Sequence, residues 1–115
     1  MSRPKHPRSR AKGRGSGESV FLAQAVKDLA KVGYLCYHVH GIGAQRSAFG
    51  FPDIVAAPPA HRTDLPVIVL ELKTGTYEMT DDQREWLARL DGRTIVAREA
   101  RPETFADIVI GILGD

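Results

Sequence analysis

Cysteine is almost absent from this chain of 115 residues, in which Cys36 is the single example. One thiol cannot form an internal disulfide, and no group of Cys and His residues has the spacing of a zinc site. Disulfide-stapled secreted scaffolds and zinc-stabilised folds are therefore excluded. We expect a reducing, intracellular and cytoplasmic setting.

Long apolar runs are also missing. None is long enough to span a bilayer, so we expect no membrane partner. The N-terminus is basic, but no apolar segment follows it, and we expect no secretory signal. The chain has no internal repeat. Its length and its 43% content of hydrophobic residues suit one globular domain.

Acidic residues are absent from residues 1–17, which carry six Lys and Arg. Residues 18–115 hold ten Lys and Arg against fourteen Asp and Glu, so the rest of the chain is mildly acidic. Because residues 1–17 have almost nothing apolar to bury, we expect a disordered basic arm. The arm is either a solubilising tail or a nucleic-acid tether. Six positive charges without an acid favour a tether with DNA contacts from Arg8, Arg10, Lys12 and Arg14.

Hydrophobic periodicity and turn residues predict seven elements after the arm. They are a helix over 18–33, strands over 34–40, 51–57 and 67–73, a helix over 80–92, a strand over 93–98 and a last helix with Pro102 in its first turn. The second and third strands are joined by nine loop residues, so we expect them to be antiparallel. The fourth strand follows a helix and should enter the sheet by a crossover. The order predicts an α/β domain over 18–115, with helices packed on a mixed central sheet.

Charged residues interrupt the two most hydrophobic strands. Asp53 lies in the strand over 51–57, and Glu71 and Lys73 lie in the strand over 67–73. Side chains alternate across a strand, so Glu71 and Lys73 share one face and the aliphatic residues between them take the other. Because both faces are otherwise apolar, this strand should be central, and an unpaired charge there costs several kcal/mol.

The simplest partner for Glu71 is Lys73. Asp53 can face the same side of the sheet, however, which leaves two carboxylates against one ammonium group. A divalent cation would neutralise that excess. Oxygen ligands without cysteine are typical of a hard ion, either Mg²⁺ or Mn²⁺.

Further polar residues allow two interpretations each. Glu18 lies on the expected buried side of the first helix, where it either interacts with the helix dipole or serves a site. Thr80 and Gln83 have the T-x-x-Q spacing of a capping box, which explains Gln83 structurally. Arg46 and Ser47, in the Gly-rich loop, are either parts of a mobile loop or phosphate contacts. For His38 and His40 we expect partial burial in a strand rather than metal binding.

The charged strand residues resemble a known signature. Pro52-Asp53 followed by Glu71-Leu72-Lys73 is similar to the motif of PD-(D/E)xK nucleases, whose core has the element order expected here. The stretches GFPDIVA, ELKTG and TDDQREWL resemble the VRR-Nuc branch in its stand-alone form. The resemblance covers residues 18–98.

The resemblance implies a restriction-endonuclease-like α-β-β-β-α-β core followed by a C-terminal helix. It implies a metal held by Asp53, Glu71 and the backbone carbonyl of Leu72, with Glu18 reaching the metal from the first helix. It implies that Lys73 either orients the attacking water or stabilises the transition state, and that Gln83 lies near the active site.

The expected function is that of a Mg²⁺-dependent or Mn²⁺-dependent DNA endonuclease. Relatives of this kind act on branched DNA, including Holliday junctions, and are often homodimers. Two alternatives remain open. One is a catalytically silent nucleic-acid-binding module with the same fold. The other is an interaction protein in which the charged residues form a structural salt-bridge cluster.

Overall fold

The computed structural model describes residues 5–39 and 49–114, with side chains from Gly17 onward. Its elements are α1 (Lys5–Lys31), β1 (Leu35–His38), β2 (Ile54–Ala57), β3 (Val67–Leu72), α2 (Asp81–Leu90), β4 (Ile95–Ala100) and α3 (Phe105–Leu113). The predicted order of helices and strands is therefore confirmed.

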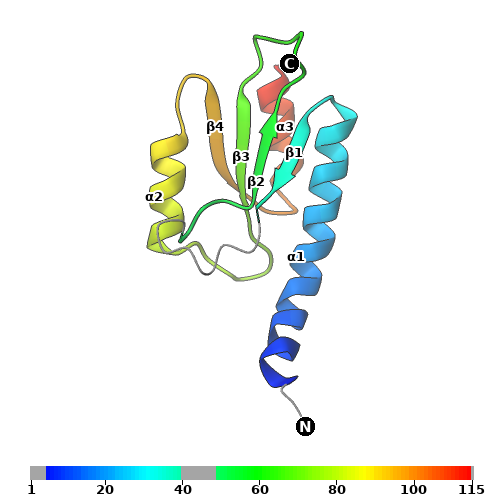
Figure 1. Cartoon of the computed structure of the whole chain (residues 1–115), viewed down its shortest axis with the longest axis vertical. Coiled ribbons are helices and arrows are strands. Elements are labelled where there is room, and N and C mark those ends of the chain that lie inside the picture. The colour runs from blue at the N-terminus through cyan, green and yellow to red at the C-terminus, as the bar shows by residue number, and fades with distance from the viewer. Residues whose placement is uncertain (1–4, 40–48, 115) are drawn as a thin grey trace.

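The four strands form one mixed sheet in the order β1-β2-β3-β4. β2 is antiparallel to both β1 and β3, whereas β4 is parallel to β3 and joins it through the α2 crossover (Figure 1). The predicted antiparallel pairing of β2 with β3 and the predicted crossover before β4 are both confirmed. Ile54 pairs with Leu70, a register that brings Asp53, just before β2, level with Glu71 on β3.

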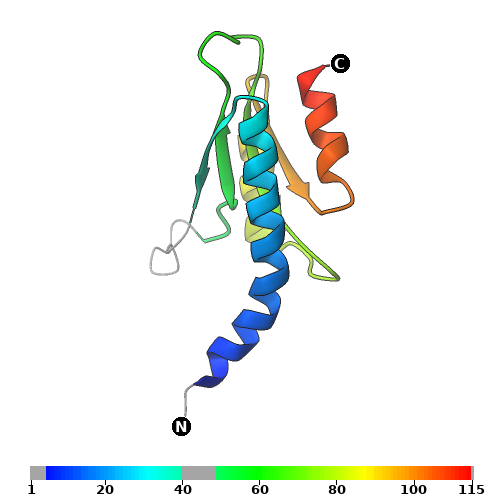
Figure 2. The same ribbon diagram turned by 90° about the vertical axis from the view of Figure 1, so that its right-hand side faces the viewer.

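Helices cover both faces of the sheet. α1 and α3 lie on one face and α2 on the other (Figures 1 and 2). Ile68, Leu70 and Leu72 pack in the larger core cluster with residues of α1 and α3, whereas Val69 packs with Leu87 of α2. The alternation predicted for β3 is therefore confirmed, and β3 is a central strand buried on both faces.

α1 differs from the sequence-based expectation at its start. The sequence predicts a helix beginning near Glu18, whereas α1 begins at Lys5 and projects beyond the end of the sheet (Figure 1). Pro7 is the third residue of α1, where the N–H groups have no partner within a helix, so its missing donor costs little. The backbone of the expected basic arm thus continues the first helix.

The ends of the other helices follow local chemistry. Thr80 and Gln83 form the predicted capping box at the start of α2. α2 ends at Leu90, two residues before the predicted end of this helix, and Asp91 is its C-cap. The Asp91 carboxylate accepts a hydrogen bond from the Ala97 N–H at 3.0 Å and turns the chain into β4. α3 begins at Phe105, so Pro102 lies in the turn before it rather than in its first turn.

A membrane span was not expected, and among the described residues no helix combines the length and the apolar character that crossing a bilayer requires.

Candidate functional site

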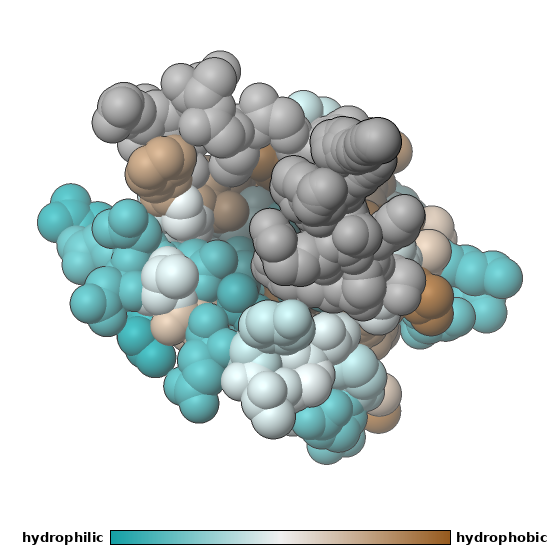
Figure 3. Space-filling model, turned by 90° about the horizontal axis from the view of Figure 1, so that it is seen from below, coloured by the Kyte–Doolittle hydropathy of each residue, from teal (hydrophilic) through white to brown (hydrophobic). Residues whose placement is uncertain are grey.

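The charged residues of the central strands meet at one end of the sheet. β3 ends there, β2 begins there, and α1 passes beside them (Figure 2). A cleft of about 150 Å³ opens at this end, lined by Glu18, Ser19, Leu22, His38, Asp53 and Leu72. Figure 3 views the molecule from this end and shows hydrophilic residues gathered on the side of α2.

Asp53 is held by backbone contacts to both neighbouring strands. Its N–H donates to the Leu70 carbonyl at 2.9 Å, and its carbonyl accepts from the Val39 N–H at 2.8 Å. Its Oδ2 accepts a hydrogen bond from the Leu72 N–H at 2.8 Å. Burial raises the pKa of Asp53, although the Leu72 N–H opposes that rise. The carboxylate is thus fixed by the strand that carries Glu71.

Glu71 and Lys73 are almost fully buried, with 3% and 5% of their surfaces exposed. The Lys73 ammonium lies 3.5 Å from Glu71 Oε2. The other oxygen, Glu71 Oε1, is buried and accepts no hydrogen bond from the described residues. Burial, and then the negative charge of Asp53, raise the pKa of Glu71 from 4.5 to about 8. The pair with Lys73 therefore satisfies only part of this carboxylate.

Glu18 adds a third acid. It reaches the cleft from α1, and its charge raises the pKa of both Asp53 and Glu71. Among the described residues, the charge of Lys73 lowers the pKa of both Asp53 and Glu71, and the charge of His38 lowers that of Asp53. Burial and the neighbouring negative charges both disfavour the ionised form of these acids. An additional positive charge in the site would therefore stabilise that form.

Hard cations suit this set of groups. Asp53 and Glu71 offer carboxylate oxygens, and one oxygen of Glu71 has no protein donor among the described residues. In the part of the chain that the structure describes, no three Asp, Glu, His or Cys side chains converge as a complete metal site. Two carboxylates are nevertheless enough for Mg²⁺, which keeps several waters and takes further oxygens from substrate phosphates. The residues present therefore fit an ion shared between protein and substrate.

Gln83 forms part of the cap at the start of α2. Its side-chain Oε1 accepts from the Thr80 N–H at 2.8 Å, and the Thr80 hydroxyl accepts from the Gln83 N–H at 3.1 Å. The capping interpretation is confirmed, and the cap uses the side-chain oxygen of Gln83 rather than its NH₂ group. Gly50 packs against the same turn, since a Cβ there would lie 2.7 Å from Asp82 and 2.9 Å from the Gln83 nitrogen.

Several predicted contacts lie outside the described residues. Arg46 and Ser47 are among them, as is His40. The backbone of α1 includes positions 8, 10, 12 and 14, but the description of side chains begins at Gly17. Their DNA contacts stay predictions.

The position of His38 in the cleft was not predicted from the sequence. It ends β1 and lines the cleft with Asp53 and Glu18. Its charge lowers the pKa of Asp53. The register of β1 on β2 would have revealed this position, but no sequence pattern specifies that register.

Comparison of the chain with family models, with curated proteins and with solved structures gives no match.

Proposed function

We propose that this chain is a metal-dependent DNA nuclease of the PD-(D/E)xK type, related to the VRR-Nuc branch. The observation that carries the proposal is Glu71, a buried carboxylate with one oxygen lacking a hydrogen bond from the described residues, beside Asp53 and Glu18. A charge-balanced structural cluster would not leave a buried carboxylate oxygen without a donor from the described residues.

Each residue has a role in this proposal. Asp53, Glu71 and the Leu72 carbonyl hold Mg²⁺ or Mn²⁺, and Glu18 contributes from α1. When bound, the ion neutralises charge on the scissile phosphate and promotes the ionisation of water. Lys73 supplies a fixed positive charge that orients the attacking water or stabilises the transition state. Rigid strands hold these groups with the precision that phosphodiester hydrolysis needs.

The structural salt-bridge alternative predicts balanced charge and satisfied oxygens. Breaking a buried pair leaves an uncompensated charge, so buried ion clusters are stable only when their charges and hydrogen bonds are matched. Glu71 Oε1 does not meet that condition among the described residues. The catalytically silent alternative requires no particular carboxylate set, so the presence of Asp53, Glu71 and Lys73 together favours the enzyme.

The substrate and assembly follow from the resemblance. We propose branched DNA, including Holliday junctions, as the substrate, and a cytoplasmic homodimer as the active form. The basic segment 1–17 supplies positive charge beside an acidic domain. α3 offers an apolar surface for the second copy, since Ile110 is 64% exposed.

A cleavage assay tests the proposal. Linear, flapped, forked and four-way DNA are incubated with the wild-type protein in Mg²⁺, in Mn²⁺ or with a chelator. We expect cutting of branched DNA only with metal. Asp53→Asn should abolish it, whereas the exposed control Asp107→Asn should not. Cleavage by Asp53→Asn at the wild-type rate would falsify the assignment.

A further inference from the structure

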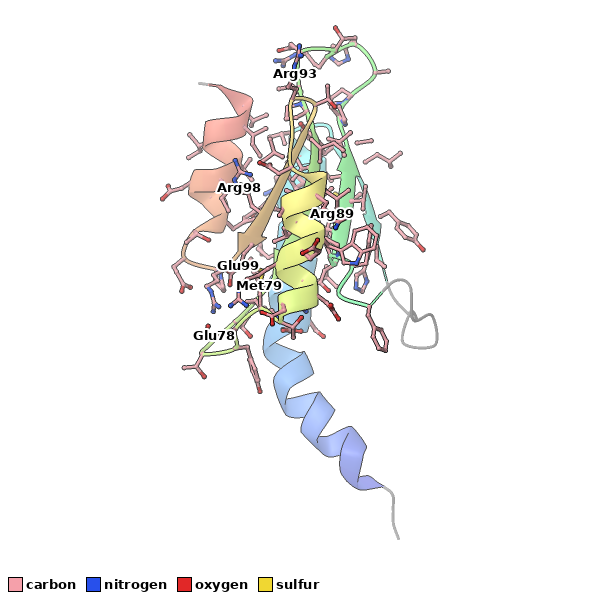
Figure 4. All side chains as sticks on the ribbon, turned by 90° about the vertical axis from the view of Figure 1, so that its left-hand side faces the viewer. Glu78, Met79, Arg89, Arg93, Arg98 and Glu99 are labelled. Carbon is pink, nitrogen blue, oxygen red and sulfur yellow. The ribbon has the colours of Figure 1, made fainter. Side chains whose placement is uncertain are left out.

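The loop of residues 74–79 borders the candidate site. It starts directly after Lys73 and ends at the α2 capping box. Glu78 and Met79 lie in it, at the opposite end of the sheet from Arg93 (Figure 4). A Cβ on Gly17 would lie 3.8 Å from the Thr74 hydroxyl, so the loop also approaches α1 next to Glu18. The conformation of this loop therefore sets the direction of the backbone immediately after Lys73.

Arg101, the first residue after β4, holds this loop. Its Nη1 donates to the Gly75 carbonyl at 3.0 Å, and its Nη2 donates to the Tyr77 carbonyl. Its Nε donates to Glu99 Oε2 at 3.0 Å, and Nη2 lies 2.8 Å from the same oxygen. All three nitrogens of the guanidinium group are thus engaged, and its side chain is only 22% exposed.

The backbone beside Arg101 contacts Lys73 directly. The Lys73 N–H, directly after β3, donates to the carbonyl of Ala100, the final residue of β4, at 3.0 Å. Beyond it, the loop has its own turn bond from the Tyr77 N–H to the Thr74 carbonyl at 3.2 Å. The guanidinium of Arg101 therefore continues the connection between β4 and the chain after β3.

We propose that Arg101 is a positioning residue that fixes loop 74–79 and thereby the orientation of Lys73 in the site. The inference rests on the proposed function. A planar guanidinium reaches two carbonyls and a carboxylate at once, whereas a lysine ammonium on a flexible stem cannot reproduce that fork. A small displacement of a catalytic group is enough to slow a reaction about 10²-fold.

The test compares Arg101→Ala and Arg101→Lys with the wild-type protein and with Arg98→Ala. Arg98 is the matched control, because it lies in β4 three residues before Arg101 and forms an ion pair at 2.6 Å with Asp91, away from the loop. DNA affinity is measured in Ca²⁺ and the single-turnover cleavage rate in Mg²⁺. Amide hydrogen exchange is measured across residues 74–79.

For Arg101→Ala we expect a rate at least about 10-fold lower, DNA affinity within about twofold of wild type, and faster exchange in the loop. Added methylguanidinium should restore part of the rate, Arg101→Lys should restore little, and Arg98→Ala should resemble wild type. Wild-type exchange in the loop of Arg101→Ala would overturn the inference, as would equal losses of rate and affinity. A wild-type protein that cuts no DNA would contradict the proposed function alone, because the exchange measurement still decides whether Arg101 holds the loop.

Discussion

Replacing Glu71 by glutamine should remove a pH-dependent loss of stability. The pKa of Glu71 is raised from 4.5 to about 8 by burial and by Asp53. Between these pH values the unfolded chain releases a proton that the folded chain retains. The contribution of Glu71 to stability is therefore fully present below its unfolded-state pKa of 4.5 and is lost as the pH rises through the folded-state pKa of about 8.

The size of the effect follows from this interval. At about 1.4 kcal/mol per pH unit, the rise from 4.5 to about 8 corresponds to a loss of about 5 kcal/mol at alkaline pH. The glutamine side chain introduced by Glu71→Gln would stay neutral at every pH. At low pH, where Glu71 is protonated, Glu71→Gln and wild type should be nearly equal in stability, and above about pH 8 the variant should be more stable by several kcal/mol.

Urea unfolding with a chelator present, at several values between about pH 5 and about pH 8.5, measures this difference. Glu78→Gln is the control, since Glu78 is exposed in loop 74–79. Wild type and Glu78→Gln should lose stability together as the pH rises, and Glu71→Gln should lose much less. The same pH dependence in all three proteins would refute the account of Glu71.

Three further predictions follow from the site and the fold. Lys73→Ala should lower the single-turnover cleavage rate by about 10²–10³-fold with little change in DNA affinity in Ca²⁺; a fall in affinity at constant rate would make Lys73 a binding residue. Gly50→Ala should lower the free energy of unfolding by about 1–3 kcal/mol more than Gly75→Ala. Both glycines have positive φ, so the backbone strain of an alanine is common to the two variants. A Cβ at Gly50 would lie 2.7 Å from Asp82, whereas a Cβ at Gly75 would meet nothing within 4 Å. Equal losses in chemical denaturation would contradict that packing. Deletion of residues 1–16 should flatten the dependence of log affinity on log salt by about 0.9 for each lost phosphate contact and leave the rate at saturating DNA unchanged; identical slopes would make the segment a solubilising tail.

The sequence was informative where one local rule decided the structure. The alternation around Val69 predicted both core faces of β3, and the Thr80–Gln83 spacing predicted the cap of α2. The approach of Asp53 to Glu71 was predictable, because two adjacent antiparallel strands carry them.

Other features depend on tertiary contacts that leave no local pattern. His38 reaches the cleft through the register of β1 on β2. Arg101 binds backbone carbonyls of Gly75 and Tyr77, and a carbonyl acceptor places no requirement on residue type at those positions. The start of α1 was missed because the proline, glycine and serine of residues 1–17 are poor helix formers, and no local pattern shows that the helix continues through them.

Calorimetric titration of Mn²⁺ tests the central claim, that Asp53 and Glu71 form a site for a divalent cation. The titration is performed at about pH 8 on the wild-type protein, on Asp53→Asn and on the control Asp107→Asn. We predict weak, saturable binding to the wild type and the control, and its loss in Asp53→Asn, because one of the two strand carboxylates is then gone. Equal binding by Asp53→Asn, or no uptake by the folded wild-type protein, would contradict the account.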